Sequence, residues 1–90
     1  MTIVNLSDSN EIESEIKNKL SEIEVKNIRI YLINDMDNLV KITNVKAKKN
    51  ILITTNLDQQ FIRKAVDKAN FLIYGKLPIE TIIDKIKGYL

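Results

Sequence analysis

The sequence predicts an α/β domain in which a four-stranded parallel sheet lies between two layers of helices. Three observations predict this class. Short, β-branched apolar runs alternate with longer segments whose apolar residues recur at helical spacing. One run, "ILITT" at 51–55, is continuously apolar up to its threonines, which is typical of a strand buried on both faces. The 90 residues suffice for one domain, and 44% of them are hydrophobic.

The first strand–helix unit occupies the N-terminal quarter of the chain. Residues 2–6 ("TIVNL") are short, apolar and β-branched, and predict a strand. Asp8 and Glu11 then form a capping-box pattern, with Ser7, Ser9 and Asn10 as alternative caps. A helix is expected over about residues 9–24, with one apolar face formed by Ile12, Ile16, Leu20 and Ile23.

The second unit has a less regular pattern. Residues 27–33 ("NIRIYLI") alternate, and Arg29 lies on one of the two sides. Alternation with a charged residue indicates an edge strand. Residues 34–50 allow a helix of about two to three turns, although Thr43 and Asn44 weaken it.

The second half of the chain repeats the alternation twice. The strand at 51–55 is followed by a helix that Asn56 and Gln59 are expected to cap. "NFLIYG" at 70–75 predicts the fourth strand. Pro78 then begins the last helix, where its missing N–H costs nothing. The whole chain, residues 1–90, is therefore expected to form one βαβαβαβα domain.

The expected strand order in this three-layer sandwich is 2-1-3-4. Right-handed crossovers in that order place helices on both faces of the sheet. The order also puts the alternating strand at an edge and "ILITT" in the interior. It predicts a switch point between strands one and three, where Asn5, Ser7 and Asp8 would face Thr55, Asn56 and Asp58.

The candidate site consists of polar residues that follow the four predicted strands: Asp8, Asp35, Thr55, Asn56, Asp58 and Lys76. In the structural interpretation, which we favour, Asp8 and Asn56 are helix N-caps, Asp35 belongs to a turn and a helix cap, and Lys76 is a solvated loop charge. In the functional interpretation, these side chains and the helix N-termini hold an anion or a hydrated cation. The carboxylates are few for Mg²⁺, so no cofactor is expected, with magnesium as the alternative.

Composition excludes several chemistries. The chain has no Cys and no His, which removes thiolate nucleophiles, disulfides and the commonest zinc ligands. Two glycines cannot form a phosphate-binding glycine loop. The basic residues Lys41, Lys46, Lys48 and Lys49 have no aromatic residue among them, so nucleic acid is not expected as a partner. No segment resembles a signal peptide or a membrane span, and a cytoplasmic location is expected.

The segment from 51 to 78 resembles the second half of a response-regulator receiver domain. In that family a strand ends in Thr or Ser, and a later strand ends in Lys before a Pro. Thr54 or Thr55, Lys76 and Pro78 are similar. "SDSNEI" at 7–12 resembles the acidic start of the first receiver helix, and Asp35 falls near the phosphoacceptor position. The acidic pair is reduced to Asp8, and one strand–helix unit is missing.

The chain also resembles small TOPRIM domains, which have four strand–helix units in the order 2-1-3-4. "NLDQQFIRKAV" is similar to the D-x-D segment of that family as it enters its helix. By this resemblance Asn5 replaces the glutamate, Asn56 replaces the first aspartate and Asp58 matches the second. The fold is more similar to this second family and the local sequence to receivers, and by either resemblance the chemical residues are depleted.

These observations together predict a small non-catalytic binding or interaction module. The alternative is a divalent-cation-dependent phosphoacceptor or nucleic-acid-processing domain that uses the acids at the strand ends. A protein partner is compatible with the sequence. The uncharged fourth strand, "FLIY" at 71–74, and the last helix each suggest a homodimer.

Overall fold

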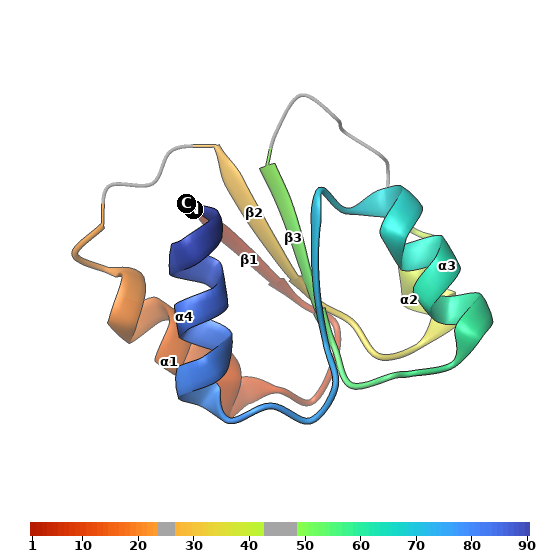
Figure 1. Ribbon diagram of the computed structural model, residues 1–90, viewed down its shortest axis with the longest axis horizontal. Helices are drawn as coiled ribbons and strands as arrows, with labels where there is room; N and C mark the ends of the chain where they lie inside the picture. Colours follow the sequence, from red (N-terminus) through yellow and green to blue (C-terminus); the bar gives the residue numbers. More distant parts are fainter. Residues whose placement is uncertain (24–26, 43–48) are drawn as a thin grey trace.

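Strands and helices alternate along the chain in the computed structural model, which describes residues 1–23, 27–42 and 49–90 (Figure 1). The elements, in order, are β1 (Thr2–Asn5), α1 (Asn10–Leu20), β2 (Ile28–Leu32), α2 (Met36–Leu39), β3 (Lys49–Thr54), α3 (Gln59–Lys68), β4 (Phe71–Tyr74) and α4 (Ile79–Tyr89). The predicted α/β class with four parallel strands and four helices is confirmed. None of the helices in these ranges is both long and apolar enough to cross a bilayer.

The strands pair in the order β1-β2-β3-β4, and all three pairings are parallel. The predicted order 2-1-3-4 is therefore wrong. β2 lies between β1 and β3, so the expected switch point between the first and third strands does not exist. The prediction that β3 is an interior strand is confirmed, and β4 lies at an edge as expected.

The strand order was mispredicted because both faces of β2 are buried, although its alternating sequence suggested that one face is exposed to solvent. Ile30 is fully buried against one face of the sheet, while Tyr31 is only 6% exposed on the other. Arg29, the charge that suggested an edge, is half-buried, and its guanidinium donates to the Tyr31 hydroxyl at 3.1 Å. β1 is the less buried strand: Thr2 is exposed, and its other residues are half-buried.

Two hydrophobic cores lie on opposite faces of the sheet, as a three-layer sandwich requires. α1 and α4 cover one face through side chains such as Ile16 and Ile83. α2 and α3 cover the other through Leu39, Phe61 and neighbouring residues. Figure 1 shows these two pairs of helices on opposite sides of the strands.

The first crossover has the opposite hand from the other two. The strands follow one another across the sheet in a single direction, yet α1 lies on the face opposite α2 and α3. The β1–α1–β2 connection must therefore turn the other way from β2–α2–β3 and β3–α3–β4. Because about 98% of parallel crossovers are right-handed, this topology contains an uncommon connection.

Two local predictions need correction. Within the described residues 34–42 and 49–50, the expected helix is the single turn of α2, while residues 43–48, with Lys46 and Lys48, lie outside the described part of the chain. The N-cap of α3 is Asp58 and not Asn56, because the Asp58 carboxylate accepts from the Gln60 and Phe61 amides.

Candidate functional site

The carboxyl ends of the first three strands surround an open hollow of about 450 Å³. It is lined by loop residues that follow β1, β2 and β3. We call it the carboxyl-edge hollow; its residues are Leu6, Ser7, Asp8, Ser9, Asn34, Asp35 and Thr55. Three of the predicted site residues, Asp8, Asp35 and Thr55, thus share one concavity even though β1 and β3 are not neighbours.

Asn34 organises the centre of this edge. Its side-chain oxygen accepts from the Thr54 hydroxyl at 3.1 Å, from the Thr55 amide at 2.9 Å and from the Thr55 hydroxyl at 3.3 Å. Thr54 is buried, so the bond satisfies a hydroxyl that has little access to water. Asn34 therefore ties the end of β2 to the end of β3.

Asn56 extends the same network toward α3. Its side-chain amide donates to the Asn34 carbonyl at 2.9 Å, and its own amide N–H donates to the Thr54 hydroxyl at 3.0 Å. Its side-chain oxygen accepts from the Asp58 amide at 2.9 Å. Asn56 and Asp58 thus shape the β3–α3 connection, and neither is among the residues that line the carboxyl-edge hollow.

Asp35 is the N-cap of α2. Its carboxylate accepts from the Asn38 backbone amide at 3.3 Å and from the Asn38 side-chain amide at 2.8 Å. Asn38 also donates to the Leu6 carbonyl at 3.3 Å, which links α2 to the loop after β1. The cap interpretation of Asp35 is therefore correct, and one carboxylate of the hollow already has a structural role.

Asp8 does not cap α1. The N-cap position is Ser9, and its side chain makes no capping hydrogen bond. Ser7 instead donates its hydroxyl to Ser9 at 2.8 Å and to the Asn5 side-chain oxygen at 3.2 Å. Asp8 is exposed, and within the ranges that the structure describes its carboxylate has no hydrogen-bond or ion-pair partner. It is the free negative charge of the carboxyl-edge hollow.

Lys76 lies beside a second, narrower hollow of about 190 Å³. This side hollow shares Ser9, Asn34 and Thr55 with the carboxyl-edge hollow, and its other residues include Ile12, Gly75 and Leu77. Gly75 has a positive φ of 101°, a conformation that L side chains rarely adopt, which explains the glycine at this turn. Lys76 therefore lies at the carboxyl edge of the sheet, in the side hollow that adjoins the carboxyl-edge hollow.

The charges at this edge are too few and too separated for a preformed metal centre. Among residues 1–23, 27–42 and 49–90, no group of three or more acidic side chains is close enough together to hold an ion. The groups that converge are hydroxyls, amides and two carboxylates. Such a set is suited to hydrogen bonding with a polar partner that carries donors or positive charge.

Sequence reasoning overlooked Asn34. The pattern "LINDMD" suggested only a turn, and nothing local indicates that the Asn34 side chain bonds residues 20 and 21 positions later. Its position directly after a strand was the one available signal, because polar residues at strand exits meet at one edge of a parallel sheet.

Comparisons with known proteins add no family. No protein-family model matches the chain, no curated protein matches it, and no solved structure matches it.

Proposed function

We propose that this chain is a non-catalytic binding module, and that it recognises a protein partner at the carboxyl-edge hollow. The observation that carries this proposal is that only one of the two carboxylates in the hollow has a structural role. Asp35 is held by Asn38 as a helix cap, whereas Asp8 is exposed and unpaired within the described ranges. One free carboxylate in a ready-made polar concavity suits recognition of a donor or a positive charge.

The hydrogen-bond network supports binding over chemistry. General acid–base and nucleophilic catalysis need a base within hydrogen-bond reach of the group that it activates. In the parts of the chain that the structure describes, the hydroxyls here bond to amide oxygens and to one another, and not to a carboxylate. The network therefore stiffens the loops, and a stiff polar surface binds with less loss of conformational entropy.

The proposal is tested by reversing the one free charge. Asp8→Arg puts a positive charge where the unpaired carboxylate was, while no hydrogen bond of the described residues is removed. Glu22→Arg, an exposed acid beyond the end of α1, is the matched control for net charge. The immobilised wild-type chain and both variants are exposed to extract of the native cell, and each recovered protein is purified and titrated into ¹⁵N-labelled chain.

A genuine partner should be retained by the wild type and by Glu22→Arg, and its recovery should fall at least about tenfold with Asp8→Arg, as expected for an ion pair buried by a partner. Its titration should shift the amide signals of Ser7, Asn34 and Thr55. Equal recovery by all three chains, or shifts confined to another surface, would contradict the proposal.

A cation-dependent phosphoacceptor is the second candidate, because Asp8 and Asp35 line the same hollow as Thr55. Millimolar MgCl₂ should then raise the melting midpoint, since a ligand specific to the folded state stabilises it. Asp35→Asn is the informative variant because Asn also caps helices well. A rise lost in Asp8→Asn and Asp35→Asn, but not reproduced by NaCl of equal ionic strength, would favour this candidate.

A further inference from the structure

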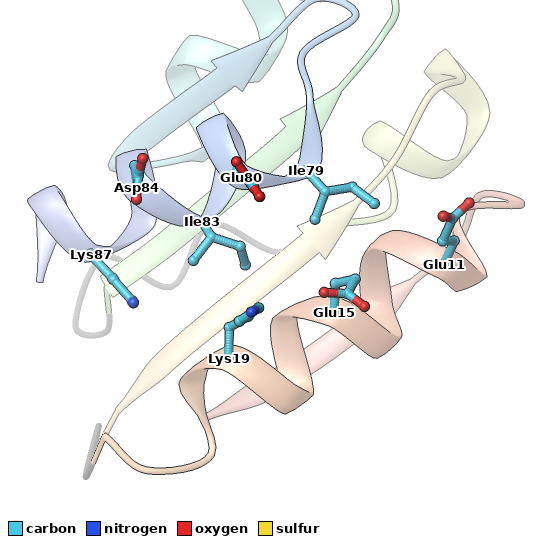
Figure 2. A pocket seen from close by; sticks show the side chains of 8 residues that line it. All are labelled: Glu11, Glu15, Lys19, Ile79, Glu80, Ile83, Asp84 and Lys87. Atoms are coloured by element: carbon cyan, nitrogen blue, oxygen red, sulfur yellow. The ribbon is translucent and has the colours of Figure 1, made fainter.

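A groove with a divided charge pattern lies on the face opposite α2 and α3. It runs between α1 and α4 and has a volume of about 430 Å³. We call it the α1–α4 groove; its residues are Glu11, Glu15, Lys19, Ile79, Glu80, Ile83, Asp84 and Lys87. Figure 2 shows Ile79 and Ile83 between the two helices, with charged side chains on both sides.

The charges are sorted along the groove by the direction of the helices. Both helices follow a strand of the same parallel sheet, so their N-terminal ends lie at the same edge. The first turns carry Glu11 and Glu80, the middles of the helices carry Glu15 and Asp84, and the last turns carry Lys19 and Lys87 (Figure 2). Negative charge near the N-terminal ends and positive charge near the C-terminal ends agree with the helix dipoles.

These six charges are unpaired within the chain as the structure describes it. The ion pair of α1 joins Glu13 and Lys17, at 3.7 Å, and it lies outside the groove. Glu11 precedes Glu15 by four residues, as Glu80 precedes Asp84, and like charges at this spacing repel by about 0.2–0.5 kcal/mol. Glu15 precedes Lys19 at the spacing that attracts, but among the described residues the ion pair that forms on α1 is Glu13–Lys17. The groove therefore offers unmatched charge of both signs around an apolar floor.

We propose that a second copy of this chain occupies the α1–α4 groove, in a two-fold symmetric, antiparallel dimer. A two-fold axis perpendicular to the groove turns the acidic end of one protomer onto the lysine end of the other. The two lysines of each copy then face the acidic end of the other, and the half-buried Ile79 is covered, whereas Ile83 is already buried within its own protomer. Such a contact is isologous and closes at two subunits.

Other occupants fit this pattern less well. A nucleic acid would be repelled by four carboxylates, and a uniformly basic segment by Lys19 and Lys87. A divalent cation would leave the isoleucine floor and both lysines unmatched. A matching partner must place positive charges opposite the acidic end of the groove and negative charges opposite its lysine end. A second copy of the chain, turned end for end, does so. The proposal is independent of the proposed function because the groove and the carboxyl-edge hollow share no residue.

The experiment is sedimentation equilibrium of the wild type and two groove variants. The first variant combines Glu15→Lys with Glu80→Lys, and the second combines Lys19→Glu with Lys87→Glu. Each should be monomeric alone, because the two-fold axis brings its substituted positions opposite charges of the same sign. Their equimolar mixture should recover association that neither variant shows alone, because the lysine end of the first variant then faces the intact acidic end of the second, and its substituted positions face substituted positions of opposite sign. This rescue also shows that both variants are folded.

Salt provides the second measurement. The wild-type dissociation constant should rise at least about tenfold between about 20 mM and about 0.5 M NaCl, because screening shortens the reach of these charges. Asp8→Arg should dimerise as the wild type does. A wild type that stays monomeric in low salt, groove variants that dimerise unchanged, or a mixture that does not associate would overturn the proposal. So would a dimer that Leu72→Lys on the β4 edge abolishes.

Discussion

At the scale of single residues, the ends of β2 and β3 depend on one amide oxygen. The Asn34 side-chain oxygen accepts three hydrogen bonds, and one of its donors, the Thr54 hydroxyl, belongs to a residue only 2% exposed. A buried donor that loses its acceptor retains its desolvation penalty without compensation. Asn34 is therefore expected to contribute more to stability than its half-buried position suggests.

We predict that Asn34→Ala lowers the free energy of unfolding by about 1–3 kcal/mol, measured by urea denaturation. Asn34→Asp keeps accepting oxygens at the same place and should lose clearly less. Thr54→Val removes the buried donor, so the double variant Asn34→Ala with Thr54→Val should lose less than the two single changes added together. Strict additivity would show that the two side chains do not interact.

At the scale of elements, α2 is too short to be stable alone, and its neighbours hold it in place. Helical turns of this length do not persist in water without tertiary contacts. Lys68 of α3 donates its ammonium group to the Val40 carbonyl at 3.3 Å and to the Ile42 carbonyl at 2.7 Å, just after α2 ends. Together with the Asp35 cap, this contact fixes both ends of the turn.

We predict that Lys68→Met lowers the free energy of unfolding by about 1 kcal/mol, because the stem is kept while two carbonyls lose a charged donor. Lys68 is half-buried, so the loss of stability should be smaller than for a fully buried charged hydrogen bond. Lys64→Met on the exposed side of the same helix is the control, and it should change stability by less than about 0.5 kcal/mol. Equal effects would mean that the Lys68 contact contributes nothing.

The elements could be predicted from the sequence because their signals are local. Apolar spacing located the strands and long helices to within a few residues, for example 27–33 against Ile28–Leu32. Strand order could not be predicted in the same way. It depends on which side chains are buried on both faces, and the polar groups of Arg29 and Tyr31 bond each other although Tyr31 is buried and Arg29 half-buried.

The candidate site was only partly predictable for the same reason. Polarity at strand ends correctly selected Asp8, Asp35 and Thr55 as residues of one hollow. It could not assign the roles of Asn34 and Asn56, because their hydrogen bonds join segments about 20 residues apart. Local patterns identify which residues lie at an edge, whereas long-range hydrogen bonds decide what those residues do there.

At the scale of the whole molecule, the β4 edge of the sheet is protected against pairing with a strand of another chain. β4 carries no charge of its own, but Lys85 from α4 lies beside it with Leu72 and Tyr74 in a shallow hollow. A lysine next to an open edge is a common protection against strand addition. This lysine favours the α1–α4 groove over the β4 edge as the self-association surface.

The strand order itself gives the last prediction. With β2 between β1 and β3, each peptide group of β2 has a neighbouring strand on both sides, whereas β1 has one neighbour. Backbone amides of Ile28–Leu32 should therefore exchange with deuterium slowly throughout, while about half of those in Thr2–Asn5 exchange fast because they point to solvent. NMR should also find backbone contacts between Ile30 and Ile51, which are register partners. In the commoner right-handed order the pattern reverses: β1 is protected on both sides, β2 exchanges at alternate positions, and contacts join β1 to β3. Finding that reversed pattern would contradict the order β1-β2-β3-β4.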